Sequence, residues 1–391
     1  MHPLTGFFVP NATVALACVA SLLAVVLYLA ARSFVLTRAR SRIPVRIHIG
    51  GTRGKSTLVK LVHAKFIAQG INAYGKVTGT TPRVLLPDGG ERPIRRFGNA
   101  SIREQESFVI GAARKEAEAL IAECMAIRPE LIAASEQKIF KSAVTAITNA
   151  WPDHLEDLGP DEDAMTQALL ELVPVDGTLV IASEAMNEQV GRVAGERRCK
   201  VVTVPTEGVP PEVALELLAA AVCEVAGVAA SCEPSFAESR KVGALRQGVV
   251  ATLPLHAGGA HGRFIDAFTC NDVQSLAYWW ERYDGAPGDA ILLNARPDRP
   301  LRTRAMLRFL AERQVEGPVF IAGDPLAARM ARRLGLSAQR LGSRLAPPDL
   351  LQQVLPFTGS STTVWGIGNH RGTGARLSAH LRSHPSVLSE A

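Results

Sequence analysis

Residues 48–57, HIGGTRGKST, combine a glycine-rich turn with a lysine and a serine. An apolar strand is expected before the turn, over 45–50, and a helix after it, over 55–69. In that order, backbone N–H groups of the turn and of the helix N-terminus can bind phosphate oxygens. Lys55 would add positive charge at the β- and γ-phosphates, and the Ser56 hydroxyl would reach Mg²⁺. The usual P-loop spacing requires glycine at position 49, which is isoleucine here. The segment is therefore either a P-loop of another kind or a glycine turn that only caps an ordinary helix.

Two further segments place chemistry at strand ends. Glu123 comes near the end of an expected strand over 119–126, and TNAWPDHLED, residues 148–157, follows another over 143–149. Open α/β sheets bind ligands at the carboxyl ends of their strands. The Ser56 hydroxyl, the Glu123 carboxylate and the His154 imidazole, with Asp153 beside it, could therefore surround a magnesium–nucleotide complex. Imidazole is an unusual Mg²⁺ ligand, and each residue alone could equally be an exposed acid or a loop histidine.

The elements that must position these residues alternate between strands and helices along most of the chain. This alternation predicts an α/β fold with mainly parallel sheet and helices on both faces. The glycine-rich stretch LPLHAGGAHG, 253–262, is the expected junction between two domains. We expect a nucleotide-binding central domain over 43–258 and a smaller α/β domain of Rossmann-like type over 259–391.

The N-terminal region differs from the rest of the chain. Residues 12–31 contain no charged side chain, and Arg32, Arg38, Arg40 and Arg42 follow them. Twenty apolar residues can cross a bilayer, and the positive-inside rule places the arginines in the cytoplasm. Residues 1–42 are therefore expected to be a single-pass membrane anchor with a basic linker. A cleaved signal peptide and a buried core helix are the alternatives.

Composition limits the remaining function classes. The 391 residues carry a formal charge of only +6, without zinc-finger spacing or an aromatic-interleaved basic stripe, so no nucleic-acid partner is expected. The six cysteines form no C-x-x-C pair. They indicate reduced thiols in a cytosolic domain.

The motifs together resemble the Mur ligase superfamily. GTRGKST matches its pattern G-T-[NKR]-G-K-[ST]-T, in which the first glycine lies three residues before the second. The strand AECMA with its glutamate, TNAWPDHLE, and DAFTCNDVQS at 266–275 resemble the other marks of that superfamily. The chain is more closely similar to the ligase subunits of poly-γ-glutamate synthases, which act in capsule biosynthesis. GKVTGTTPRVLLPDG, NASIREQ, ECMAIRPEL, NARPDRPLRT and GIGNHRGTG carry that resemblance.

The resemblance implies an ATP-dependent amide ligase that uses Mg²⁺ and adds glutamate to a growing chain through an acyl phosphate. Lys55 would stabilise charge on the transferred phosphoryl group; Ser56, Glu123 and His154 would hold the metal, and Asp153 would orient His154. The expected nucleotide-binding residues are Gly51, Thr52, Arg53, Gly54, Lys55, Ser56 and Thr57 from the turn, with Asp266 and Asn271 from the second domain.

Arginines could bind the carboxylates of glutamate and of the polymer by bidentate contacts. Arg83, Arg296 and Arg299 are the candidates, and a solvated loop is the alternative for each. Many Mur-type ligases also use a carbamylated lysine after the D-H-x-[DE] motif. No lysine occurs from Leu155 through Cys199 in this chain, so we expect none here.

Two other functions stay open: a Mur-type ligase that joins glutamate to another acceptor, and a membrane-anchored nucleotide-binding switch or scaffold. The anchor favours the polymer ligase, and the joint presence of Glu123 and the TNxxxDH segment argues against the switch. Integral-membrane subunits of a polymer synthase are the partners that the resemblance implies, with the catalytic domains in the cytoplasm.

Overall fold

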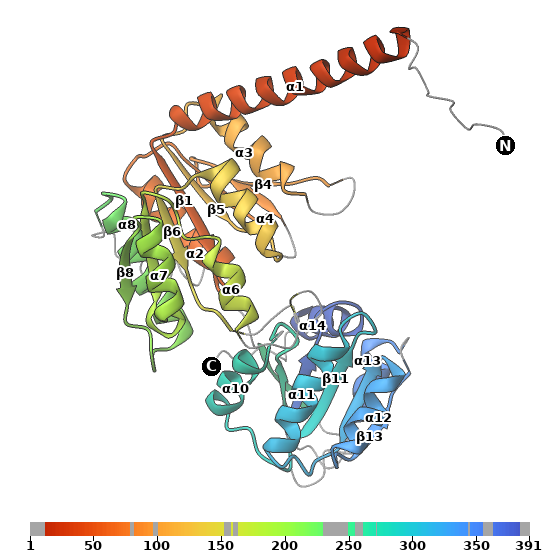
Figure 1. Cartoon of the computed structure of the whole chain (residues 1–391). Helices are drawn as coiled ribbons and strands as arrows, with labels where there is room; N and C mark the ends of the chain where they lie inside the picture. Colours follow the sequence, from red (N-terminus) through yellow and green to blue (C-terminus); the bar gives the residue numbers. More distant parts are fainter. Residues whose placement is uncertain are drawn as a thin grey trace, which may run out of the picture.

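The computed structural model contains two α/β units and a long N-terminal helix that projects from the first unit (Figure 1). The structure describes residues 12–78, 82–96, 101–151, 158, 163–229, 249–254, 261–270, 272–342, 345–354 and 363–383. The expected α/β fold with mainly parallel sheets is confirmed.

The first unit is built on an eight-stranded sheet in the order β4-β3-β2-β5-β1-β6-β7-β8. The strands are β1 (Val45–Gly50), β2 (Ala73–Val77), β3 (Arg83–Leu85), β4 (Glu91–Pro93), β5 (Ala119–Glu123), β6 (Val144–Ile147), β7 (Thr178–Ala182) and β8 (Lys200–Val204). All neighbours pair in parallel except β2 with β3 and β3 with β4. The carboxyl ends of β2, β5, β1 and β6 therefore lie at one edge of the sheet.

Helices cover both faces of this sheet because its central strands are apolar on both sides. One apolar cluster joins the β1 side chains Ile47 and Ile49 to α2 (Lys55–Ala68) and α8 (Pro211–Val225). On the other face lie α3 (Arg103–Ala113), α4 (Pro129–Ala133), a π-helical segment η1 (Ala134–Phe140), α6 (Ala164–Leu170) and α7 (Glu188–Glu196), with the 3₁₀ turn η2 (Ser183–Ala185) after β7.

A tight turn joins α3 to β5. Helix α3 ends at Ala113, and Glu116 adopts a left-handed backbone conformation with φ 55°. The N–H group of Ala117 then donates to the Ala112 carbonyl, which closes a turn directly before β5. The reversal is needed because β5 runs parallel to β1 in the centre of the sheet.

The second unit has a six-stranded sheet in the order β13-β12-β11-β14-β10-β9. Its strands are β9 (Val249–Pro254), β10 (His261–Asp266), β11 (Ala290–Ala295), β12 (Val319–Gly323), β13 (Ala338–Arg340) and β14 (Thr363–Gly368). Its helices are α10 (Val273–Arg282), α11 (Pro300–Glu312), α12 (Pro325–Arg333), α13 (Pro347–Val354) and α14 (Thr373–Ser383). Among the described strand pairs of this second sheet, only β9 with β10 is antiparallel. Strand β9 precedes residue 258 and pairs with β10 of this sheet. The domain boundary at residue 258 stays a prediction.

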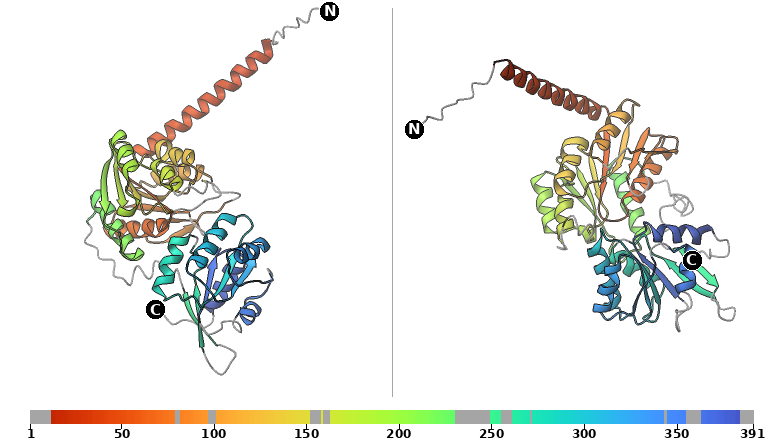
Figure 2. Two further views of the ribbon diagram at one scale, coloured as in Figure 1. Left: turned by 60° about the horizontal axis from the view of Figure 1, so that its bottom comes forward. Right: turned by 90° about the vertical axis from the view of Figure 1, so that its right-hand side faces the viewer.

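Helix α1 (Ala12–Ser41) is thirty residues long and contains the predicted apolar run. It is the one helix among the described residues with the length and composition to cross a membrane, and its apolar window is not buried in the protein. Its last turns behave differently: Leu36 and Ala39 are buried against α3 and η1, together with Ile43. Figure 2 shows the apolar portion extending away from both units.

A candidate nucleotide and metal site

The turn between β1 and α2 has the geometry of a phosphate-binding loop. Gly51 has φ 118° and Gly54 has φ 83°, backbone conformations that residues with a side chain rarely adopt. A Cβ atom on Gly51 would lie 2.2 Å from Thr148 Oγ1 and 2.9 Å from the backbone of Asn149. Both the backbone conformation and the space therefore require glycine, which explains the first glycine of the GTRGKST motif.

The segment after β6 holds this turn in place. Asn149 Oδ1 accepts from the N–H groups of Thr52 at 3.2 Å and Arg53 at 2.9 Å, and Thr148 Oγ1 donates to the Arg53 carbonyl at 2.5 Å. Sequence reasoning assigned no role to Thr148 or Asn149. The signal was present, because a Thr-Asn pair directly after an apolar strand places hydrogen-bonding side chains at the sheet edge.

Lys55 and the start of α2 make the turn electropositive. The Lys55 ammonium donates to the carbonyls of Gly51 at 2.7 Å and Thr52 at 3.1 Å, so its charge lies over the turn. The first N–H groups of a helix have no carbonyl partner within the helix, and the helix dipole adds positive potential there. A polyphosphate placed at this turn would meet backbone donors and the ammonium group together.

Glu123 lies beside this turn, as the sequence predicts. It is the last residue of β5, paired in register with Ile49, and only 5% of it is exposed. Its Oε2 accepts from Ser56 Oγ at 2.7 Å and from the Thr78 N–H at 2.8 Å. The Ser56 hydroxyl of α2 and the Glu123 carboxylate of β5 thus lie within hydrogen-bond distance of each other. Hard oxygen donors of this kind suit Mg²⁺, which is bound by few protein carboxylates and keeps several waters.

The described residues supply only part of a metal shell. Within that part of the chain, no group of three or more histidine, cysteine, aspartate or glutamate side chains is placed to hold an ion. Asp153, His154 and Asn271 lie outside the described residues. A cation at Glu123 would take its further ligands from Ser56, water, the substrate phosphates or the segment that contains His154.

Behind Glu123, a buried lysine and a glutamine form a support that sequence reasoning missed. Gln105 Nε2 donates to the Glu123 carbonyl at 3.0 Å, and Gln105 Oε1 accepts from Lys76 Nζ at 2.9 Å. Lys76 is 1% exposed, and burial lowers its pKa to about 8, although the Glu104 carboxylate 3.8 Å away acts to raise it. The signals were the lysine of GKVTG and the glutamine of SIREQ, both in stretches that carry the family resemblance.

A second buried titratable side chain, His48, belongs to β1 itself. His48 Nδ1 is 2.8 Å from Glu136 Oε2, and the imidazole stacks on Phe140. Burial acts to lower the pKa of His48, but hydrogen bonds with Cys124 and Glu136 raise it to about 9. Glu136 also accepts from the N–H and hydroxyl of Ser142. This ion pair connects β1 to η1 directly below the phosphate turn.

Of the remaining predicted site residues, Arg83, Asp266 and Arg296 lie at or directly after strand ends, and Arg299 lies at the start of a helix. Arg83 is paired in register with Val77 at the edge that holds Glu123, and its Nε is 3.4 Å from Glu91 Oε2. Asp266 ends β10 and is 2% exposed. Arg296 directly follows β11 and pairs with Asp298, and Arg299 is the residue before α11. Asp266 and Arg296 thus share the carboxyl edge of the second sheet.

Arg53 behaves differently from its neighbours in the turn. Its Nε is 2.5 Å from Asp272 Oδ2 at the start of α10, in the second unit. The side chain of a residue predicted to bind nucleotide therefore contacts the other unit in this structure.

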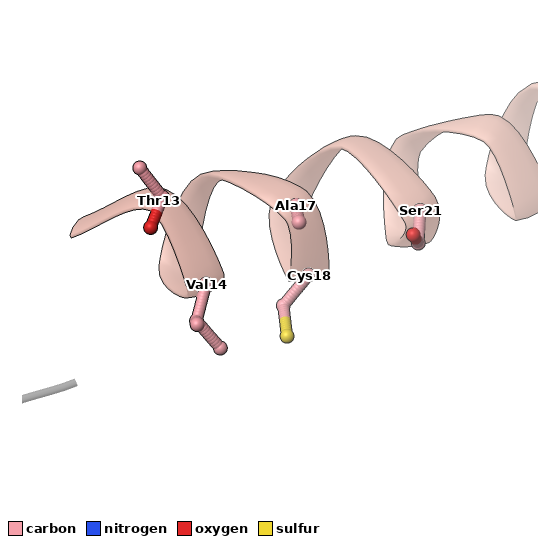
Figure 3. Close-up of a pocket in the computed structure, with 5 residues that line it drawn as sticks. All are labelled: Thr13, Val14, Ala17, Cys18 and Ser21. Atoms are coloured by element: carbon pink, nitrogen blue, oxygen red, sulfur yellow. The ribbon is translucent and has the colours of Figure 1, made fainter. Parts of the chain in front are cut away.

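A hollow at the start of α1 offers no comparable chemistry. The side chains of Thr13, Val14, Ala17, Cys18 and Ser21 line it along the first turns of the helix (Figure 3). None of them carries a charge that could bind phosphate or a cation. The candidate site is therefore the sheet edge at Lys55 and Glu123.

Comparison with known proteins agrees with this geometry. Residues 252–384 match the family model of the poly-gamma-glutamate synthase CapB C-terminal domain. PGA synthase CapB of Bacillus subtilis (strain 168) is 30% identical over 351 residues, which cover 86% of this chain and 89% of the relative.

Solved structures share the fold. A bifunctional folylpolyglutamate synthase/dihydrofolate synthase of Yersinia pestis, complexed with AMPPNP and Mn, superposes with a TM-score of 0.57 at 16% identity, covering 90% of this chain and 92% of that one. MurF of Acinetobacter baumannii gives a TM-score of 0.59 at 13% identity, covering 90% and 79%.

Proposed function

The chain belongs to the poly-γ-glutamate synthase CapB family, and on that premise we propose that it adds glutamate to a growing poly-γ-glutamate chain. It is an ATP-dependent amide ligase that uses a divalent metal. The finer assignments concern the acceptor, the intermediate, the metal and the residues, and each is argued below from the contacts at the site.

We propose a reaction in two steps. A carboxylate oxygen at the end of the polymer attacks the γ-phosphorus of ATP, the bond to the β-phosphate oxygen breaks, and an acyl phosphate and ADP result. The amine of the incoming glutamate then attacks the acyl carbon, loses a proton, and expels inorganic phosphate as the γ-amide closes. The ATP γ-phosphoryl bond supplies the free energy that direct condensation in water lacks.

The phosphate turn supplies the main electrostatic stabilisation in this proposal. Backbone N–H groups at the start of α2 and the Lys55 ammonium, held over Gly51 and Thr52, would bind the β- and γ-phosphates. The residues Gly51 to Thr57 would contact the nucleotide chiefly through their backbone. Asp266 and Asn271 would contact it from the second unit.

Ser56 and Glu123 are proposed to hold Mg²⁺, with His154 as a further ligand that Asp153 orients. When bound, the ion would neutralise phosphate charge and fix the phosphate geometry. Ser56 Oγ already lies 2.7 Å from Glu123 Oε2 beside the phosphate turn, and this is the observation that carries the proposed function. Arg83, Arg296 and Arg299 are proposed to bind the carboxylates of the substrates.

We propose that α1 anchors the protein in the cell membrane and that both α/β units face the cytoplasm, where ATP is present. The apolar run of α1 and the arginines that follow it support this topology. Relatives that act in capsule synthesis support integral-membrane partners that pass the polymer across the membrane.

The proposal is tested with membranes that contain the full chain, supplied with ATP and glutamate. Glutamate-dependent ADP release and a γ-linked polymer are expected. Lys55→Ala should lower turnover by about a thousandfold or more, because it removes the cation at the transferred phosphoryl group. Lys60→Ala is the control, since it removes a lysine of the same helix that contacts Glu91 instead. Glu123→Gln should raise the Mg²⁺ concentration needed for half-maximal activity.

The same assay separates the alternatives. Glutamate transfer only to an added acceptor would identify a ligase for another substrate. ATP binding without glutamate-dependent turnover would identify a switch or scaffold. Normal turnover in both the Lys55 and Glu123 variants would show that the site is elsewhere.

A further inference from the structure

The two units meet along α10, and the contact begins in the phosphate turn itself. Arg53 Nε lies 2.5 Å from Asp272 Oδ2 at the N-terminus of α10. In the last turn of α10, Arg282 Nη1 lies 3.4 Å from Glu212 Oε1 of α8. Both ends of α10 therefore touch the first unit, and Figure 2 shows this helix on the side of the second unit that faces the first.

The two contacts differ in burial. The Asp272 side chain is 1% exposed, whereas Arg282 and Glu212 are 44% and 26% exposed. A buried carboxylate requires a compensating cation and hydrogen bonds. Asp272 receives both: Arg53 supplies the cation, and Ser275 donates its N–H at 2.7 Å to Oδ1 and its hydroxyl at 2.9 Å to Oδ2. The carboxylate thus caps α10 and pairs with Arg53 at the same time.

Arg53 is fixed from the other side by the first unit. Its N–H and carbonyl groups are bound by Asn149 and Thr148, the residues that hold the phosphate turn. The backbone of Arg53 is therefore part of the phosphate site while its guanidinium belongs to the contact between units. A movement of the turn on phosphate binding would move the partner of Asp272.

No apolar core bridges the two units within the described residues. Three apolar clusters belong entirely to the first unit and α1, and two belong entirely to the second unit. The position of the second unit relative to the first therefore depends on polar contacts. Of the two ion pairs, Arg53–Asp272 is shorter and less exposed than Arg282–Glu212, so it is expected to be the stronger one.

We propose that Arg53 and Asp272 are positioning residues whose ion pair holds the second unit against the phosphate turn. This rests on the proposed function, because the position of the second unit matters for the ligase step. It would bring Asp266 and the start of α10 toward the nucleotide and exclude water from a reactive acyl phosphate. The Arg53 side chain acts through Asp272 and not by binding phosphate.

The test uses the full chain in membranes or detergent. Arg53→Gln and Asp272→Asn each remove one charge, and asparagine keeps the capping oxygen for α10. Each should lower kcat about tenfold, with the ATP dissociation constant changed less than about threefold, and the double variant should be no worse than either single one. The control pair Arg282→Gln and Glu212→Gln should stay within about twofold, because exposed ion pairs contribute little.

A second readout does not require activity. Fluorophores introduced as unnatural amino acids at the exposed positions Glu188 and Arg333 report the separation of the two units by energy transfer. The Arg53 and Asp272 variants should broaden the distance distribution, and the Arg282 variant should not. If the parent chain had no ligase activity, this readout would still test the pair, so the two proposals fail separately.

Other outcomes overturn the inference. Loss of ATP binding in Arg53→Gln with an unchanged distance distribution would make Arg53 an ordinary phosphate ligand. Additive losses in the double variant would show that the two side chains act independently. Arg53→Lys should recover part of kcat relative to Arg53→Gln, because lysine keeps the charge although it lacks the planar guanidinium. If Arg53→Lys recovered no kcat while its distance distribution stayed narrow, a role of Arg53 in positioning the second unit would also be contradicted.

Discussion

The central sheet is joined to α1 at the amino end of β1 and to α10 at the turn after its carboxyl end, and the two junctions are built from different interactions. The α1 junction is largely apolar: Leu36, Ala39 and Ile43 are buried in one cluster with Phe108 of α3 and Phe140 of η1. The α10 junction is made by charged side chains, Arg53 with Asp272 and Arg282 with Glu212.

Hydrogen bonds reinforce the α1 junction at several points. Arg32 Nε donates to Glu106 Oε1 at 2.6 Å, and Arg40 donates to the Ile139 carbonyl at 3.2 Å. Arg46, at the start of β1, donates to the carbonyls of Ile43, Phe140 and Lys141 at 2.6, 3.1 and 2.8 Å. Interlocked apolar and polar contacts of this kind hold a helix in one orientation.

The two junctions are expected to differ in how easily they open. Closely packed apolar surfaces do not slide or separate without a large free-energy cost, whereas a contact made by a few charged pairs can open and reform. The end that leads to the proposed membrane anchor is built to stay fixed. At the end that carries the phosphate site, the described contacts with the second unit are charged pairs, and no described apolar cluster spans the two units.

The largest expected effect tests the fixed end. Ile43 is fully buried between α1 and β1, so Ile43→Ala should lower the free energy of unfolding by about 2–5 kcal/mol. Denaturant unfolding of the detergent-solubilised chain measures this. Val35→Ala is the control on the same helix: Val35 is 44% exposed, and its change should stay within about 0.5 kcal/mol. Equal effects would mean that α1 is not packed as described.

The next effect concerns the nucleotide end, where Lys76 is buried behind Glu123. Its pKa of about 8 lies below the ordinary 10.5, so between these pH values the unfolded chain binds more protons than the folded one. Stability should therefore rise with pH in this window, relative to Lys76→Met, by on the order of 3 kcal/mol. Unfolding from pH 7 to 10.5 measures it, and the partly exposed Lys60→Met serves as the control. A constant difference between parent and Lys76→Met would show that Lys76 titrates normally.

His48 should give the opposite slope. Its pKa of about 9 lies above the ordinary 6.5, so its stabilising contribution is complete below pH 6.5 and is lost as pH rises through 9. His48→Gln should therefore be strongly destabilised at pH 6 and less so at pH 9.5, because it leaves Glu136 buried without its cation. A difference that grows with pH would contradict the ion pair. Opposite slopes would distinguish Lys76 of β2 from His48 of β1.

A smaller effect is expected at Glu106, where α1 meets α3. The hydrogen bond from Arg32 lowers the pKa of Glu106, so its contribution is present above the ordinary value of 4.5 and disappears as pH falls through the lowered pKa. The melting temperature of Glu106→Gln should lie below that of the parent at pH 7 and converge with it in acid. Glu130→Gln, on an exposed position of α4, should match the parent at both pH values.

The smallest effect compares the two junctions directly. Raising the salt concentration from about 0.05 to 0.5 M shortens the range of electrostatic interactions and should slightly widen the separation of the fluorophores at Glu188 and Arg333. A second pair, across α1 and α3, should report a smaller change, because buried apolar packing holds that junction together with the Arg32–Glu106 ion pair. If both pairs responded alike, the contrast between the junctions would be wrong.

Much of the first unit and of its site was predictable because the information is local in the chain. A strand, a glycine turn and a helix with Lys55 and Ser56 follow one another without interruption, and Glu123 ends an apolar strand. The parallel sheet then brings these ends together whatever the details of packing. The membrane-compatible helix was predictable for the same reason, since twenty apolar residues form one continuous run.

The contacts that support the site were not predictable, because each joins residues far apart in the chain, and a residue's type does not identify its partner. Lys76 meets Gln105 only because α3 packs beside β2 and β5, and a lysine in a strand normally indicates an exposed edge. Asn149 meets Thr52 and Arg53 only after β6 pairs with β1. Arg53 was predicted to bind nucleotide, and its contact with Asp272 depends on how two separate units pack.

The sequence by itself therefore determined the proposed chemistry and the edge of the sheet at which Lys55, Ser56 and Glu123 lie, because side-chain types and strand order set both. Only the tertiary structure decided which groups hold Glu123 in place, how firmly α1 is joined to the sheet, and that Arg53 reaches across to α10. The physical reason is that burial and pairing of charges depend on surfaces brought together by folding, and local residue patterns do not encode which distant carboxylate an arginine will meet.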